Sequence, residues 1–138
     1  MKIMHAMIAT VAICAAPMSM AQGQSSEAEA DAANLAVVEA HIAAYRSGNL
    51  DRFVATFAPN AEVYANGMEA RGHKEIRALY ALNFTKGAPK VRIEETEAAN
   101  GMVYVTVGYV FSDGQEMCCS LSEYEVVNGK IVYLSASG

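Results

Sequence analysis

The sequence predicts an α+β domain in which a cone-shaped, curved antiparallel sheet packs on three helices, in the order ααββαββββ. In the first half of the chain, apolar residues recur every three or four positions, which indicates amphipathic helices. In the second half they mostly alternate with polar residues, the period of a β-strand. Asx-Gly pairs, the strongest two-residue hairpin signal, occur at four positions: 66–67, 100–101, 113–114 and 128–129.

Residues 1–21 have the organisation of a secretory signal peptide. Lys2 precedes a short apolar run, and Ser19 and Ala21 are the small residues at −3 and −1 of a cleavage site. The run is shorter than the roughly 20 apolar residues that a membrane-spanning helix needs. We therefore expect cleavage near Ala21 and export of the protein, to the periplasm or to the medium.

Two helices are expected next, after a flexible lead at residues 22–33, so that the folded domain spans 34–138. The first helix ends at Gly48, because glycine terminates helices readily. Asn49 can cap a second, short helix, which Pro59 stops. The apolar faces of the two helices are Leu35, Val38, Ile42 and Tyr45, and Leu50, Phe53, Val54 and Phe57.

A hairpin around Asn66-Gly67 and a third helix at 73–84 precede the last four strands. Val103, Val105 and Val107 alternate with polar neighbours, so one face of the sheet is strongly apolar. A curled sheet with helices over this face encloses a conical cavity, and such cavities are common small-ligand sites. The four strands are expected at 90–99, 102–112, 115–127 and 130–136.

The composition limits the partners that we expect. The chain has 138 residues and a net charge of −5, without a basic stripe, which argues for one domain and against nucleic-acid binding. No segment after residue 21 is apolar enough to enter a membrane. No two histidines stand at metal-ligand spacing, so we expect no metal and no cofactor.

Cys118 and Cys119 are the only cysteines after the signal segment. Adjacent residues on a strand point to opposite faces, so we expect one thiol in the core and the other on the opposite face. A vicinal disulfide, which an oxidising compartment would favour, is the alternative that the sequence leaves open.

Three segments carry a resemblance to a known family: "AAYRSGNLDRFVATFAPNAEVYANG", "EARGHKEIRALYALNF" and "YEVVNGKIVYLSASG". They resemble the SnoaL-like branch of the nuclear transport factor 2-like (NTF2-like, or ketosteroid isomerase-like) superfamily, in the family's order. The resemblance implies the cone-shaped fold. It implies no single activity, because the superfamily includes isomerases, cyclases, dehydratases, hydrolases and noncatalytic domains.

The resemblance allows a residue-by-residue test for ketosteroid isomerase chemistry. That pattern needs a carboxylate base, a tyrosine and a protonated acid around one carbonyl. The tyrosine position falls on His41, the base position on Ala65 and the acid position on Ser122. Ala65 cannot take a proton, so we do not expect a standard ketosteroid isomerase.

The cyclase branch of the family uses one acidic residue on a long strand, for which Glu123 and Glu125 are the nearest candidates. Strict alternation places both on the face opposite Ser122, so we interpret them as solvated glutamates unless a bulge turns one inward. His41, with Ser122 or a tyrosine, is then the candidate acid–base group.

Three functions therefore remain open. The first is a small-molecule isomerase, cyclase or hydrolase using His41 and Ser122. The second is a domain that binds a small apolar ligand without chemistry. The third is an interaction module that forms a homodimer through the open sheet face. The residues expected to line the cavity are Tyr45, Tyr64, Ala65, Tyr80, Tyr109 and Tyr124.

Overall fold

The computed structural model describes the backbone of residues 19–138 and the side chains of residues 26–138. Most of the expected signal peptide, residues 1–18, lies outside the described residues. Within the described part, no helix combines the length and the apolarity that crossing a membrane requires.

The structure confirms the expected α+β class and the element order, with three α-helices and a six-stranded sheet. The helices are α1 (Ser19–Arg46), α2 (Leu50–Ala55) and α3 (Gly72–Tyr80), and a short 3₁₀ helix (Ala81–Phe84) follows α3. The strands are β1 (Phe57–Ala65), β2 (Met68–Arg71), β3 (Lys90–Ala99), β4 (Met102–Val110), β5 (Glu116–Val127) and β6 (Lys130–Ser137).

The sheet has the spatial order β2-β1-β6-β5-β4-β3. After β2 the chain crosses through α3 to the far edge and then returns strand by strand, so the last strand, β6, lies beside β1. This contact is parallel, whereas the other four strand pairs are antiparallel as expected. Three of the connecting turns form as the sequence predicts, with Asn66, Asn100 and Asn128 at positive φ. The fourth pair, Asp113-Gly114, lies in a longer connection, residues 111–115, because β4 ends at Val110 and β5 begins at Glu116.

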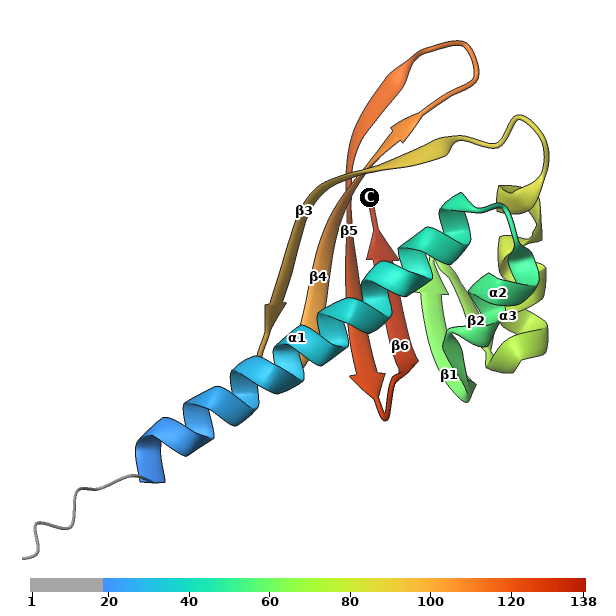
Figure 1. Ribbon diagram of the computed structural model, residues 1–138. Coiled ribbons are helices and arrows are strands. Elements are labelled where there is room, and N and C mark those ends of the chain that lie inside the picture. Colours follow the sequence, from blue (N-terminus) through green and yellow to red (C-terminus); the bar gives the residue numbers. More distant parts are fainter. Residues whose placement is uncertain (1–18) are drawn as a thin grey trace, which may run out of the picture.

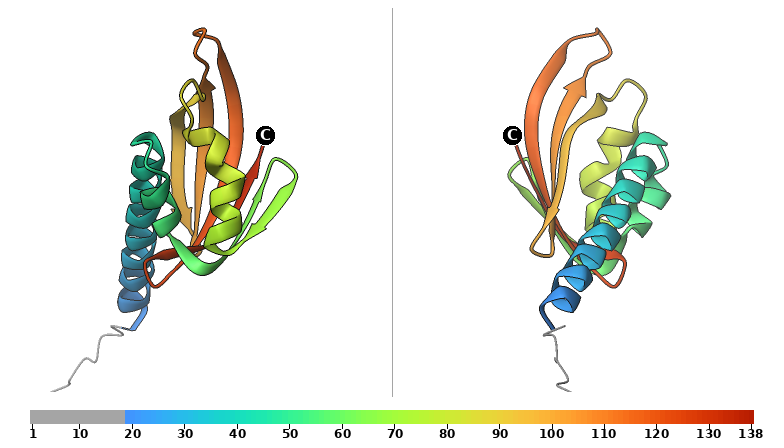
Figure 2. Two further views of the ribbon diagram at one scale, coloured as in Figure 1. Left: turned by 90° about the vertical axis from the view of Figure 1, so that its right-hand side faces the viewer. Right: turned by 60° about the vertical axis from the view of Figure 1, so that its left-hand side comes forward.

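Helix α1 lies diagonally across the concave face of the curved sheet, and α2 and α3 lie near β1 and β2 (Figure 1). Figure 2 shows that β4 and β5 are curved, with their concave side toward the helices. The buried side chains of the sheet, among them Val103, Val105 and Leu134, point into the layer beneath α1. The apolar face of the sheet is therefore the face that the helices cover.

Helix α1 begins earlier than the sequence indicated. The segment 22–33, expected to be a flexible lead, is part of the helix. The described side chains of this segment are mostly exposed, so packing does not explain its conformation. Its many alanines have the highest intrinsic helix propensity, and this outweighs the polarity that suggested a flexible chain.

The end of the second helix also differs from the expectation. Asn49 caps α2 as expected, with its side chain accepting a hydrogen bond from the Arg52 backbone N–H at 3.0 Å. The helix ends at Ala55, however, and Phe57 is the first residue of β1, where it pairs with Ile131. A register shift follows Phe57, and this irregularity accommodates Pro59 inside the strand.

The expectation for the two cysteines is wrong. Cys118 and Cys119 are both exposed, and they form a vicinal disulfide. They lie where the pairing of β4 with β5 shifts between Val107 and Tyr109, so strict alternation fails at this point of the strand.

Candidate functional site

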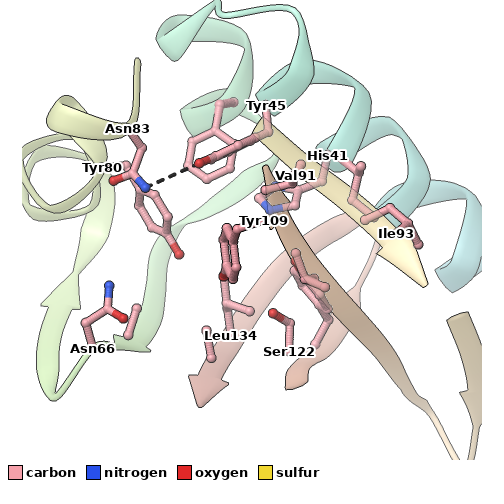
Figure 3. A pocket seen from close by; sticks show the side chains of 16 residues that line it. His41, Tyr45, Asn66, Tyr80, Asn83, Val91, Ile93, Tyr109, Ser122 and Leu134 are labelled. Atoms are coloured by element: carbon pink, nitrogen blue, oxygen red, sulfur yellow. Dashed lines mark hydrogen bonds between the residues drawn. The ribbon is translucent and has the colours of Figure 1, made fainter. Parts of the chain in front are cut away.

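A cavity of about 100 Å³ lies between α1, the α3 region and the concave face of the sheet. It is open on one side, and half of its lining residues are apolar. Figure 3 shows polar side chains from several elements around one space, with His41 and Tyr45 from α1, Tyr80 from α3 and Ser122 from β5. The cavity therefore combines apolar walls with convergent polar groups, as small-ligand sites do.

His41 is placed against this cavity by the register of α1. Val38, His41 and Ala44 follow one another at helical spacing and are all buried. The His41 side chain is 3% exposed, and its imidazole packs against the rings of Phe53 and Phe57 at centroid distances of 4.5 and 5.0 Å. The surrounding aromatic rings therefore fix the orientation of the imidazole.

The hydrogen bonds of Thr56 determine which nitrogen of His41 carries the proton. The Thr56 hydroxyl donates its single hydrogen to the Phe53 carbonyl oxygen at 2.6 Å. The contact of 2.7 Å between Thr56 Oγ1 and His41 Nδ1 must then be donated by the imidazole N–H. Neutral imidazole carries one proton, so Nε2 is the bare nitrogen and acts as a hydrogen-bond acceptor.

No described residue donates a hydrogen bond to His41 Nε2. Every fully buried polar side-chain atom of the described residues has a partner, so Nε2 is not fully buried. The bare nitrogen must therefore be open to the cavity that the residue lines. Burial lowers the pKa of His41 from 6.5 to about 3, because the desolvated site disfavours the charged imidazolium. At neutral pH the side chain is consequently an uncharged acceptor.

The tyrosines around the cavity are neutral hydrogen-bonding groups. Burial raises the pKa values of Tyr80 and Tyr124 well above that of free tyrosine. The Tyr45 hydroxyl, whose pKa is also raised mainly by burial, accepts a hydrogen bond of 3.3 Å from Asn83. The Tyr109 and Ser120 hydroxyls are 2.9 Å apart. No hydrogen bond from a described residue affects the pKa of Tyr80, and the residue lines the cavity, so its hydroxyl is available to a ligand.

The cavity lining contains no formal charge. None of the described residues that line it is Asp, Glu, Lys or Arg. A charged ligand would lose its hydration there without gaining a counter-charge. The electrostatics of the site therefore favour a neutral ligand.

The structure brings most of the expected site residues together at this one cavity. The positions that the resemblance assigns to ketosteroid isomerase groups, His41, Ala65 and Ser122, all line it. Four of the expected tyrosines line it as well: Tyr45, Tyr80, Tyr109 and Tyr124.

Tyr64 is the exception, because it lies away from the cavity. Ala65 is buried against the cavity, and its neighbour on the strand must face the opposite side of the sheet. The Tyr64 hydroxyl instead donates to Glu69 at 3.3 Å, and its ring lies 5.8 Å from that of Tyr133. The period of two could have excluded Tyr64 from the sequence alone.

Glu123 and Glu125 do not line the cavity, as strict alternation indicated. Sequence reasoning missed the roles of Thr56 and Asn83. The signal for Asn83 was present, since it continues the helical register of Tyr80. No pattern in the sequence signalled that Thr56 would meet His41, fifteen residues earlier.

Comparison with known proteins places this geometry in a family. The profile described as "SnoaL-like domain" matches residues 38–134. No curated protein matches at a significant level.

Several solved structures are similar in fold. A putative polyketide cyclase from Sinorhizobium meliloti has a TM-score of 0.66 at 18% identity, over 73% of this chain and 93% of its own. An NTF2-like protein of unknown function from Mesorhizobium loti reaches 0.67 at 16% identity, over 78% and 93%. A protein with a ketosteroid isomerase-like fold from Catenulispora acidiphila, in complex with trimethylamine, reaches 0.63 at 16%, over 74% and 84%. At these identities the similarity establishes the fold alone.

Proposed function

This chain belongs to the SnoaL-like domain family, and from that premise we propose that its cavity binds a small, neutral, largely apolar ligand carrying one hydrogen-bond donor. The observation that carries the proposal is His41, whose Nδ1–H is held by Thr56 and whose bare Nε2 is open to an uncharged cavity. A ligand hydroxyl, enol or N–H would complete the hydrogen bonding of this nitrogen.

The size of the cavity supports a ligand of about one ring. Its volume of about 100 Å³ is below the roughly 300–1,000 Å³ that is usual for drug-sized ligands. Phe53, Leu134 and Ala65 supply apolar walls, and the Tyr80 hydroxyl supplies a second polar contact. The expected ligand is therefore a compact apolar molecule with polar atoms near Nε2 and the Tyr80 hydroxyl.

Catalysis by His41 with Ser122 or a tyrosine is the second candidate. The bare Nε2 has the tautomer that a general base requires. A pKa of about 3, however, makes proton uptake unfavourable near neutral pH, and no lining carboxylate would stabilise the imidazolium. These two observations support binding over acid–base chemistry.

We expect phenol to bind the cavity better, relative to toluene, than its apolarity alone explains. The two molecules have nearly the same shape, but only phenol can donate a hydrogen bond to Nε2. Substitution of His41 by phenylalanine should lower the phenol-to-toluene affinity ratio about fivefold, the equivalent of one neutral hydrogen bond of about 1 kcal/mol. Chemical-shift titrations of wild type and His41→Phe measure this ratio.

His73→Gln is the matched control, because His73 lies outside the cavity and bonds the Phe57 carbonyl oxygen at 2.8 Å. This variant should keep the wild-type ratio. Benzoate, which adds a charge to the same ring, should not bind detectably. An unchanged phenol-to-toluene ratio in His41→Phe would remove His41 from the proposed site.

Export belongs to the proposal as well. The vicinal disulfide supports it, because disulfides persist mainly in oxidising compartments. We propose that the mature chain begins at Gln22, which N-terminal sequencing of the protein recovered from its host would show.

A homodimer through the outer sheet face is the remaining proposal. The alternating valines of β4 point toward the helices, so the outer face of the sheet is less apolar than expected. It still carries Leu121, which is 40% exposed, beside the half-buried Tyr104. Sedimentation velocity at micromolar concentration tests this, and a monomer throughout would exclude the dimer.

A further inference from the structure

Two irregularities of the sheet lie side by side, outside the cavity. On β5, Cys118 and Cys119 together face the single residue Gly108 of β4. On β3, the pairing with β4 shifts at Glu94, between the partners of Val107 and Thr106, and the Glu94 side chain reaches back to Gly108. The two irregularities are neighbours along β4, and Glu94 lies within reach of the cysteines.

The missing side chain of Gly108 leaves the space that the Glu94 carboxylate occupies. A Cβ atom at Gly108 would lie only 2.7 Å from Glu94 Oε1. A carboxylate oxygen of Glu94 and the two Sγ atoms all lie within 4.8 Å of one another. Arg92 pairs with Glu94 and, at 2.9 Å, with Glu116, so the carboxylate beside the disulfide belongs to a compact charged group.

The disulfide has little to contribute to the global stability of the fold. It joins residues that are adjacent in sequence, and the stabilisation by a cross-link grows with the length of the loop it closes. Both cysteines are exposed, and exposed disulfides are generally the labile or functional ones. A local chemical role explains the pair better than a structural one.

We propose that Cys118 and Cys119 form a thiol–disulfide exchange site that reacts with a dithiol. A thiolate of the dithiol attacks one Sγ, forms a mixed disulfide and breaks the Cys118–Cys119 bond, whose electron pair leaves on the other Sγ and takes up a proton. The second thiol of the reagent, losing its proton, attacks the mixed disulfide. The reagent leaves as a disulfide, and the protein gains two electrons and two protons as a pair of thiols.

Glu94 lowers the rate of this exchange, because its negative charge repels the incoming thiolate. Arg92 partly neutralises that charge. The exchange rate should therefore depend on both residues, and added salt should reduce the dependence.

The test treats the full chain, in native buffer, with increasing dithiothreitol. Samples are quenched with acid and alkylated, and intact mass spectrometry counts the labelled thiols. We expect two labels to appear together while circular dichroism reports a folded protein. Oxidised dithiothreitol should reverse the labelling. Labelling that appears only after denaturation would overturn the proposal. So would two thiols that oxidised dithiothreitol does not convert back to a disulfide.

Charge variants make the test specific. Glu94→Gln should be reduced about threefold faster than wild type, and Arg92→Gln about threefold slower, with both differences shrinking in high salt. Both residues lie at the surface, so the variants should fold. Glu123→Gln, on the neighbouring part of β5, should react like wild type. Equal rates for all variants would overturn the role of Glu94.

Discussion

Acidification from pH 7 to pH 4 is expected to cost the protein about 3 kcal/mol of unfolding free energy through His41 alone. The folded-state pKa of about 3 lies below the reference value of 6.5. Between these values the unfolded chain binds a proton that the folded chain excludes. The contribution is therefore fully present above pH 6.5 and is lost as the pH falls toward 3.

Urea denaturation of wild type and His41→Phe at several pH values measures this effect. Phenylalanine keeps an aromatic ring beside Phe53 and Phe57 but cannot take a proton. The difference in unfolding free energy between the two proteins should shift by about 3 kcal/mol across the range, while titrating groups common to both cancel.

His73→Gln is again the control. If the acid sensitivity disappeared in this variant and persisted in His41→Phe, the wrong histidine would have been identified. A constant difference between wild type and His41→Phe from pH 7 to pH 4 would mean that water reaches the imidazole in the folded state. His41 would then be charged at low pH in the folded protein, and the proposal that its Nε2 is a desolvated, neutral hydrogen-bond acceptor would fail.

Local signals were sufficient to predict most of the fold. The Asx-Gly turns and the alternation of β4 determine the hairpins, because each depends on residues that are neighbours in the sequence. The errors occur where a contact with a segment far away in the sequence overrides the local pattern. Phe57 continues the apolar register of α2, but its pairing with Ile131 of β6 draws it into β1, and sequence periodicity carries no information about that contact.

The candidate site shows the same limit. The helical register of α1 places His41 near the cavity, but its chemical state depends on Thr56, which no local pattern connects to it. The cysteines are a second case, since an irregular strand pairing beside Gly108 overrides the alternation that governs the rest of β5. Register predicts which side of an element a residue occupies, and tertiary contacts decide what the residue can do there.

Phe53→Ala is expected to destabilise the protein by about 3–5 kcal/mol. Phe53 is 1% exposed, and its ring contacts those of His41, Tyr80 and Phe84 at centroid distances of 4.5, 4.8 and 5.2 Å. Its removal leaves a void that these rings cannot close without losing their own contacts. Phe111→Ala, at a side chain that is 36% exposed, is the matched control and should cost much less.

Phe53→Ala also tests the proposed cavity, because Phe53 forms one of its walls. The void should join the existing space and admit a ligand larger by about one ring, since apolar cavities bind apolar molecules of matching size. Naphthalene, with two rings, should therefore raise the unfolding midpoint of Phe53→Ala more than that of wild type, as ligands that bind only the folded state do. If Phe53→Ala lost the expected stability but naphthalene had no effect, the wall would have collapsed, and the cavity would be too deformable to select a ligand by shape.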